Sequence, residues 1–415
     1  YFIGQISENI DDEVSLVIKT STVKDTNPEI IEAKNRNIKI ITRAELLAII
    51  MQDYQNITIA GTHGKTSTTA MTGIMLEVAG LDPTVINGGV INYFSSNYKI
   101  GSGKYLVAES DESDASFVDL PTKIGAITNI EAEHLEFIKY DGCFEKQKSY
   151  YEQYVKQIPD DGLCVLCVDN DEVKKIYDKL KTSKANLFSY SITDKNADLT
   201  IQNVVQDISG SHFDAVFKDG NIIKNIKISC HGMHNISNSL VAIAVARFLK
   251  VSDEKIIEAL GQCNGVKRRF TKVGEYQGAS IIDDYAHHPT EISTTLKSAK
   301  QVAGKNKVIC VFEPHKYSRV HSLFNEFCKS FSDADYVIVS QVYSTGQEPI
   351  EGATQDDLIA GIKKTGHKNV IKLDHENDLA KIIKPLIETG DIVFCAGAGL
   401  VSTWAQNLEQ QLKNC

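Results

Sequence analysis

Residues 59–69 read IAGTHGKTSTT, and this glycine-containing stretch decides how the surrounding chain is interpreted. It follows the apolar run NITIA, which is typical of a buried strand. After it, Ala70, Ile74 and Val78 recur on one helical stripe until the sequence GLDP ends the pattern. A loop of small residues between a buried strand and a helix is the context that a phosphate-binding loop requires. We therefore predict an α/β domain with a nucleotide site at this loop.

The spacing of the loop is shorter than usual. In the pattern G-x-x-x-x-G-K-S/T a glycine would stand at position 59, where this chain has Ile59. Lys65 would serve the outer phosphates and the hydroxyl of Thr66 a Mg²⁺ ion, while the helix N-terminus favours negative charge. The alternative is a tight turn with a solvated lysine. The position of Gly-Lys-Thr at the first helical turn favours nucleotide binding.

Composition and charge argue against several other classes of function. With 415 residues, two or three domains are expected, and the net charge of -10 argues against coating nucleic acid or an anionic membrane. We find neither an apolar run of about 18 residues nor a signal-peptide pattern, so we expect a soluble, cytoplasmic protein. The nine cysteines indicate reduced thiols, and the pair Cys164 and Cys167 favours a buried strand over a zinc site, which needs four ligands.

The alternation of predicted strands and helices along the sequence predicts three α/β domains. Residues 1–53 would be part of a Rossmann-like N-terminal domain whose start appears missing, since the chain begins without methionine in an apparent strand, YFIG. Residues 54–267 would form a central domain that resembles a P-loop ATPase, with a mostly parallel sheet and a small antiparallel sheet over 198–230. Residues 268–415 would form a C-terminal Rossmann-like domain, with helices predicted over 289–303 and 318–331.

Polar clusters follow the next two predicted strands of the central domain. The acidic stretch ESDESDASF begins at Glu109, and its carboxylates would repel one another unless a cation such as Mg²⁺ offset their charge. The alternative is a solvated acidic loop. Asn129 and His134 follow the strand after it, where proximity to the other strand ends favours a functional histidine over a structural one. Further on, His234 precedes Asn235, which could simply cap the helix after it.

In the predicted C-terminal domain, polar residues again follow the ends of predicted strands. Arg268 and Arg269 stand where it begins, either as a solvated hinge or as cations that closure brings to the phosphates. The stretch DDYAHH, residues 283–288, ends a strand, and one of its adjacent histidines would be structural, because neighbours on an extended chain point to opposite sides. His315 and Arg319 are four residues apart and share a helix face if the helix has begun. Arg319 then suits a substrate carboxylate. The glycines of AGAGLVS receive no role.

The loop GTHGKT resembles the Mur ligase family, whose loop reads G-T-N/H-G-K-S/T, and His63 resembles the branch that adds alanine to UDP-N-acetylmuramate. Five motifs occur in the family order: GTHGKT, ESDESDASF, HN-x-x-N, DDYAHHPTE and FEPHKYSR. Glu133 stands where the family usually has aspartate. The resemblance implies ATP contacts by Gly61, Thr62, His63, Gly64, Lys65, Thr66, Ser67, His234, Asn235 and Arg269. It implies metal binding by Thr66, Glu109 and His134, catalytic roles for Lys65, His134 and Arg269, and substrate contacts by Tyr285, His287, His315 and Arg319.

As the resemblance implies, the protein would be an ATP-dependent, ADP-forming ligase that uses two Mg²⁺ ions. It would join L-alanine to the lactyl carboxylate of UDP-N-acetylmuramate through an acyl phosphate, in bacterial wall synthesis. We expect a monomer or homodimer without nucleic-acid or membrane partners. Two alternatives remain: a ligase that attaches a tripeptide to the same sugar nucleotide, and a noncatalytic, nucleotide-binding regulator.

Overall fold

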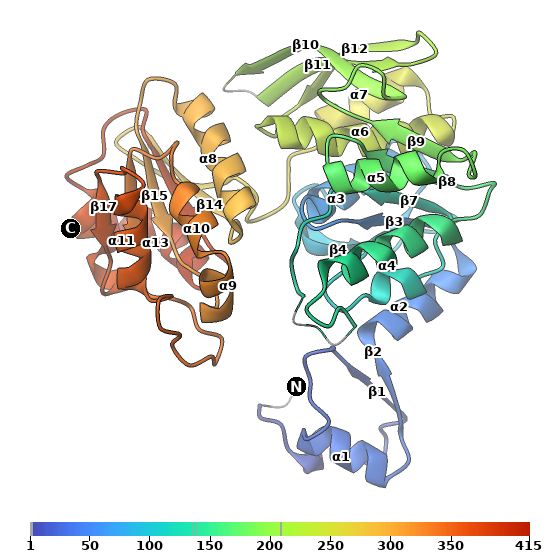
Figure 1. Cartoon of the computed structure of the whole chain (residues 1–415), viewed down its shortest axis with the longest axis horizontal. Helices are drawn as coiled ribbons and strands as arrows, with labels where there is room; N and C mark the ends of the chain where they lie inside the picture. Colours follow the sequence, from blue (N-terminus) through green and yellow to red (C-terminus); the bar gives the residue numbers. More distant parts are fainter. Residues whose placement is uncertain (1–2, 136, 138, 208–209) are drawn as a thin grey trace. The chain divides into compact units, whose positions relative to one another are not determined.

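The computed structural model describes residues 3–135, 137, 139–207 and 210–415 (Figure 1). The chain divides into two compact units. One comprises Tyr1–Asn87, Tyr98–Thr200 and Val241–Ser252, and the other comprises Gly88–Asn97, Ile201–Leu240 and Asp253–Cys415. Within the described ranges, no helix combines the length and the apolar character that a membrane span needs.

The N-terminal segment has the predicted α/β rhythm. Strands β1 (Leu16–Lys19) and β2 (Lys39–Thr42) pair in parallel, and helices α1 (Pro28–Asn35) and α2 (Arg43–Ile50) follow them. Thr42 starts α2, because its hydroxyl accepts from the Glu45 N–H at 3.1 Å and the Glu45 carboxylate accepts from the Thr42 N–H at 2.6 Å. The strand expected at YFIG is not found at Ile3 and Gly4, which form a bend, and the first two residues lie outside the described ones.

A parallel sheet forms the centre of the first unit. Its core strands are buried on both faces, as the continuous apolar runs predicted. Strand β3 lies between β6 and β7, and β8 and β9 continue beyond β7. The elements are β3 (Gln55–Ala60), α3 (Lys65–Val78), β4 (Thr84–Ile91), β5 (Ser96–Lys99), β6 (Tyr105–Glu109), β7 (Ile124–Ile127), α4 (Phe144–Gln157), β8 (Leu163–Cys167), α5 (Asp171–Leu180) and β9 (Leu187–Tyr190).

Helices α4 and α5 cover one face of this sheet (Figure 1). Tyr151, Tyr154 and Val155 of α4 pack with Ile127 of β7 and Leu166 of β8 in one apolar cluster. Cys164 and Cys167 are buried, free thiols of β8, so the buried-strand interpretation of this pair is confirmed.

The antiparallel strands predicted over 198–230 are present. Strand β10 (Leu199–Asp207) begins beside β9, where Leu199 pairs with Tyr190. Strands β11 (Gly210–Phe217) and β12 (Ile222–Ile228) pair antiparallel around a turn in which Gly220 has a φ of 90°. Helices α6 (Met233–Phe248) and α7 (Asp253–Gly261) follow.

The C-terminal domain is a six-stranded sheet with the order β13-β14-β18-β15-β16-β17, parallel except at β13. Alternate residues of β15 face two apolar clusters, one under α8, α10 and α11 and the other under α12 and α13. The elements are β13 (Thr271–Tyr276), β14 (Ala279–Asp284), α8 (Pro289–Ala303), β15 (Val308–Phe312), α9 (Tyr317–Ser322), α10 (Phe324–Lys329), β16 (Tyr336–Val339), α11 (Gln355–Lys364), β17 (Val370–Lys372), α12 (Leu379–Ile383), β18 (Ile392–Ala396) and α13 (Val401–Asn414).

One predicted helix of this domain is wrong. The segment 318–331 forms two short helices, α9 and α10, because the backbone of Leu323 leaves the helical region at φ -118° and ψ 27°. Leu323 and its neighbour Phe324 both pack against the apolar cluster below. The change of direction at Leu323 therefore lets two adjacent apolar side chains share one core.

The packing of Phe312 predicts a strong dependence of stability on its ring. Phe312 is fully buried, and its ring centroid lies 5.7 Å from that of Phe327 and 5.2 Å from that of Phe331. We expect Phe312→Ala to cost about 3–5 kcal/mol of unfolding free energy, because it removes apolar contacts and leaves a cavity. Chemical denaturation followed by fluorescence measures this cost. Leu400→Ala, at a side chain that is 49% exposed, is the control and should change stability by less than about 0.5 kcal/mol. Equal effects of the two substitutions would contradict this account of the core.

Candidate active site

The glycine loop lies between β3 and α3 and is held by the residues that follow β7. Gly61 has a φ of 131°, and an added Cβ would lie 2.1 Å from Oγ1 of Thr128, so only glycine fits there. The N–H of Thr62 donates to the carbonyl of Asn129 at 3.0 Å, and the N–H of His63 donates to the Asn129 side chain at 2.8 Å. These hydrogen bonds hold the loop against the residues that follow β7.

The N-terminus of α3 follows directly from the loop. Gly64 precedes it with a φ of 84°, and Lys65, Thr66 and Ser67 form its first turn. The hydroxyl of Thr66 donates to Oε1 of Glu109 at 3.1 Å, because Glu109 ends β6 beside β3. A hydroxyl and a carboxylate at the positive end of a helix suit a Mg²⁺ ion and the phosphates of a nucleotide.

Lys65 is held inside the loop by three acceptors. Its Nζ lies 2.6 Å from the Gly61 carbonyl, 3.0 Å from the Thr62 carbonyl and 2.6 Å from Oε2 of Glu112. Burial acts to lower the pKa of Lys65, but the charges of Glu112, Glu109 and Asp111 outweigh it and raise that pKa. Lys65 is therefore a buried, charged ammonium.

Glu112 was not singled out from the sequence. Its side chain is buried, and this burial raises the pKa of its carboxyl, while the charge of Lys65 acts in the opposite direction. The only sequence signal was its membership of the acidic stretch after β6, which does not distinguish it from its neighbours.

Two of the predicted histidines of the central domain, His63 and His134, belong to the glycine loop and to the segment after β7. His63 belongs to the loop, and its Nε2 is 3.4 Å from Oε2 of Glu131. His134 has a φ of 58°, which is uncommon for residues other than glycine, and its Nε2 lies 3.9 Å from Oε1 of Glu133. Asp111 is within electrostatic reach of both Lys65 and His134. The predicted residues of this domain that follow β3, β6 and β7 are thus brought to one edge of the sheet.

His234 and Asn235 lie at the start of α6. Asn235 is inside the helix and does not occupy its N-cap position, while its side-chain amide donates to the carbonyl of His231 at 2.8 Å. The same amide nitrogen lies 3.1 Å from Nε2 of His234. Burial, together with the charge of Arg269, lowers the pKa of His234 to about 4. The imidazole is therefore neutral at physiological pH, and contact with adenine remains a prediction.

Arg268 and Arg269 both approach the ring of Tyr285. Their guanidinium carbons lie 4.7 Å and 5.3 Å from its centroid. Arg268 also donates to the Gly397 carbonyl at 2.8 Å, which anchors it in the C-terminal sheet. Nη1 of Arg269 lies 3.8 Å from Oε1 of Glu291. The role of Arg269 at the phosphates remains a prediction.

The two adjacent histidines after β14 have different surroundings. His288 is buried and caps α8, since its Nδ1 accepts from the N–H of Thr290 at 3.4 Å. Nδ1 of His287 instead lies 2.9 Å from the carbonyl of Tyr285, and its ring centroid is 5.9 Å from that of His315. His287 is therefore the one turned toward the other predicted substrate residues.

His315 and Arg319 meet although His315 precedes the helix. Helix α9 begins at Tyr317, so the expected shared helix face does not exist. Nevertheless, Nη1 of Arg319 lies 3.1 Å from Nδ1 of His315. The ring of His315 stacks on Tyr343 at a centroid distance of 5.8 Å. Tyr285, His287, His315 and Arg319 thus form one cluster at the carboxyl ends of β14 and β15, and Tyr343 adds an aromatic wall that the sequence did not reveal.

The glycines of AGAGLVS surround a carboxylate. Oε2 of Glu313 accepts from the N–H of Val401 at 3.1 Å, and a Cβ on Gly399 would lie 2.5 Å from the same oxygen. Gly399 is also close to Tyr343, because its added Cβ would lie 2.8 Å from Cγ of that ring. This turn therefore supports the wall of the substrate cluster from behind.

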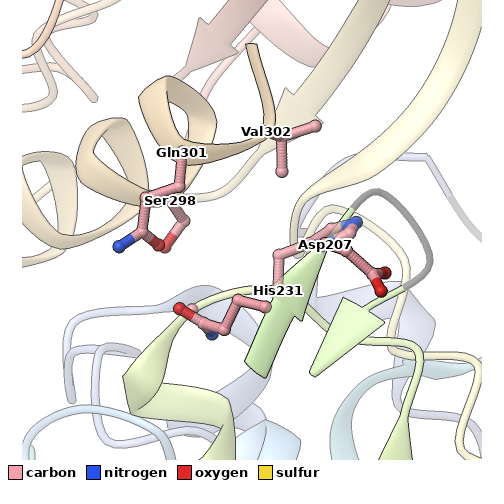
Figure 2. A pocket seen from close by; sticks show the side chains of 7 residues that line it. Asp207, His231, Ser298, Gln301 and Val302 are labelled. Atoms are coloured by element: carbon pink, nitrogen blue, oxygen red, sulfur yellow. The ribbon is translucent and has the colours of Figure 1, made fainter. Parts of the chain in front are cut away.

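A small pocket of the second unit lies away from the predicted residues. Figure 2 shows Asp207 and His231 opposite Ser298, Gln301 and Val302 of the α8 segment. None of the predicted site residues lines it.

Three family models match successive parts of the chain. A model of the Mur ligase family, catalytic domain, matches residues 1–55, the Mur ligase middle domain matches residues 59–246, and the Mur ligase glutamate ligase domain matches residues 268–399. A relative from Paracoccus denitrificans is 43% identical over 99% of this chain and 86% of its own length, and is named UDP-N-acetylmuramate--L-alanine ligase. This chain belongs to the Mur ligase family.

Other relatives agree with this assignment. The Mur ligase from Gluconobacter oxydans with the same name is 43% identical over 99% of this chain and 86% of its own length. The crystal structure of UDP-N-acetylmuramate-alanine ligase from Thermotoga maritima has a TM-score of 0.83 at 25% identity, covering 100% of this chain and 88% of that one. A murein peptide ligase from Psychrobacter arcticus has a TM-score of 0.69 at 23% identity, covering 99% of this chain and 88% of that one. The predicted three-domain α/β fold of a Mur ligase is confirmed.

The surroundings of His315 predict acid sensitivity of this Mur ligase. Burial, with the charges of Arg319, His287 and Lys316, lowers the pKa of His315 to about 4, whereas an unfolded histidine has a pKa of about 6.5. Between these values the unfolded chain binds a proton that the folded chain does not, so stability falls as the pH drops through this window.

We expect His315→Asn to reduce this loss, because the amide oxygen replaces Nδ1 as an acceptor and does not titrate. The measurement is the difference in melting temperature between pH 7 and pH 5, which should be smaller in the variant. His321→Asn, at an exposed histidine of the same helix region, should keep the wild-type difference. An unchanged difference in the His315 variant would contradict the assignment.

Proposed function

We propose that this Mur ligase joins L-alanine to the lactyl carboxylate of UDP-N-acetylmuramate with ATP, forming ADP and phosphate. The observation that carries the proposal is 43% identity over 99% of the chain to a relative named for this reaction. The site geometry supports it, since a phosphate loop and a cluster suited to an amino acid are both present. We infer a cytoplasmic location, where such sugar nucleotides are made.

The first unit has the residues to hold a magnesium nucleotide. The backbone from Gly61 to Ser67 would cradle the phosphates, with Lys65 at the outer ones. The oxygens of Thr66 and Glu109, 3.1 Å apart, suit one Mg²⁺ ion. We assign His134 to a second ion on the family resemblance. We assign adenine contacts to His234 and Asn235, which belong to the second unit.

The second unit has the residues to hold the amino acid. Arg319 presents a planar guanidinium that can bind the carboxylate of alanine through two parallel hydrogen bonds. His315 accepts from Arg319 and so orients it. Tyr285 and His287 would line the space for the amine and the small side chain.

In this reaction the protein mainly offsets the negative charge of the phosphoryl group. It does not need to form a covalent bond to the substrate. Magnesium, when bound, would neutralise charge on the transferring phosphoryl group. Lys65 and Arg269 would add positive charge as the lactyl carboxylate takes that group to form an acyl phosphate. The bound amine would then attack the acyl carbon, and the tetrahedral intermediate would expel inorganic phosphate to leave the amide. Positioning by Arg319 raises the rate by holding the nucleophile in place.

Two alternatives are separated by one assay. The tripeptide ligase of wall recycling would release phosphate with a tripeptide and not with L-alanine, and a noncatalytic regulator would release none. We expect phosphate release from ATP, Mg²⁺ and UDP-N-acetylmuramate to depend on L-alanine. Serine and glycine, offered in place of alanine, test the size of the space for the substrate side chain. Analytical ultracentrifugation separately distinguishes a monomer from a homodimer. Release that depends on the tripeptide alone would refute the proposal.

Lys65→Ala should abolish ligation while leaving the fold intact. The reason is that the substitution removes the ammonium group that the Gly61 and Thr62 carbonyls hold inside the loop. We expect product formation to fall at least about 100-fold, as for loss of a charge that stabilises a transition state. Circular dichroism checks the fold. Near-normal product formation would contradict the role of Lys65 at the phosphates.

A further inference from the structure

The ammonium of Lys65 is enclosed by three oxygen atoms. An ammonium group has three N–H donors. The three acceptors around Nζ are the carbonyls of Gly61 and Thr62 and the carboxylate of Glu112, at distances of 2.6, 3.0 and 2.6 Å. A phosphate oxygen that approaches Nζ must therefore compete with these oxygens for the ammonium group.

Glu112 is the acceptor whose contact conflicts with a phosphate. The two carbonyls belong to the loop itself, and the loop is tied to Asn129 and Thr128 by hydrogen bonds. The carboxylate of Glu112 carries the same sign of charge as the phosphates, and its side chain is only 2% exposed, so water screens it little. Repulsion would therefore act on Glu112 first.

Packing from a distant segment fixes Glu112 in this place. The hydroxyl of the fully buried Tyr140 donates to the main-chain carbonyl of Glu112, and the N–H of Ala115 donates to the same oxygen at 3.0 Å. Tyr140 belongs to the apolar cluster with Tyr151 and Tyr154 of α4. The backbone at Glu112 is thus anchored, while its carboxylate has Lys65 as its cationic partner.

Glu109 and Glu112 have separate surroundings within the same acidic stretch. Glu109 accepts from the hydroxyl of Thr66, which places it on the side of the expected metal ion. Glu112 contacts the ammonium of Lys65. The side chain of Asp111, between them in sequence, is 45% exposed and lies 3.6 Å from Arg43. One carboxylate is therefore available to a metal and another to the lysine.

We propose that Glu112 is a resident counterion of Lys65, which the outer phosphates of the nucleotide displace, and that this competition weakens nucleotide binding. The inference rests on the proposed function, because it requires a nucleotide at the loop. In the free protein Glu112 holds the buried ammonium in place. In the complex the phosphates take over that contact, and the carboxylate of Glu112 turns away from Lys65.

The test is the affinity of the full chain for a non-hydrolysable ATP analogue with Mg²⁺, measured by calorimetry. Glu112→Gln keeps the shape of the side chain and one acceptor oxygen but removes the charge. We expect it to bind the analogue about tenfold more tightly than the wild type, because the phosphates no longer compete with a carboxylate. Asp119→Asn, at a side chain that is 68% exposed, is the matched control and should change the affinity less than about twofold.

The outcomes separate the inference from the proposed function. If the wild type binds the analogue and a folded Glu112→Gln binds it equally or more weakly, the inference is wrong and the proposed function stands. If the wild type binds no nucleotide, both fail. Should Glu112→Gln not fold, as judged by thermal melting, Glu112→Asp decides, because its carboxylate is one methylene further from Lys65. Glu112→Asp should then bind more tightly than the wild type, and unchanged or weaker binding overturns the inference.

Discussion

The parallel pairing of β3 with β6 and β7 is the constraint on which the candidate nucleotide site depends. It places the carboxyl ends of three strands at one edge of the sheet. The glycine loop follows β3, Glu109 is the last residue of β6 and Asn129 lies two residues after β7. These residues therefore lie close together at one edge of the sheet. Gly61 is required there because the approach to Thr128 leaves no room for a Cβ. The fold thus provides a preformed loop in which Lys65 is already buried and charged.

The C-terminal domain uses the same principle for a different ligand. Tyr285 and His287 follow β14, His315 follows β15 and the AGAG turn follows β18. These three strands are neighbours, and their carboxyl ends gather a cationic and aromatic cluster. Glu313 fills the glycine turn with a buried carboxylate, and this turn supports Tyr343. The same rule of sheet topology therefore accounts for both halves of the proposed ligase.

Much of this could be predicted from the sequence, because strands that are buried on both faces appear as continuous apolar runs. The runs before Gly61 and after residue 104 were recognised for this reason, and the loop and the acidic stretch then followed from their positions. The domain boundaries at 53 and 267, and the individual roles of the site residues, remain predictions. The break at Leu323 was missed because adjacent apolar residues fit a helical pattern until the core beneath them is known.

The partners of single side chains were less predictable. The burial of Glu112 depends on Tyr140 and on α4, which lie some distance along the chain, and no local pattern distinguishes it from Asp111. The wall formed by Tyr343 depends on a bridge to His315 that brings together two loops. The position of the site could thus be predicted from the charged residues, the glycine spacing and the strand ends. Which acidic side chain contacts Lys65 depends on tertiary packing and could not be predicted.

The central claim is that the loop around Gly64 binds a magnesium nucleotide. A crystal structure of the full chain with Mg²⁺ and a non-hydrolysable ATP analogue tests it most directly. The account predicts Lys65 against the outer phosphate oxygens and the oxygens of Thr66 and Glu109 around the ion. A nucleotide bound elsewhere, or an ion that neither Thr66 nor Glu109 approaches, would contradict it.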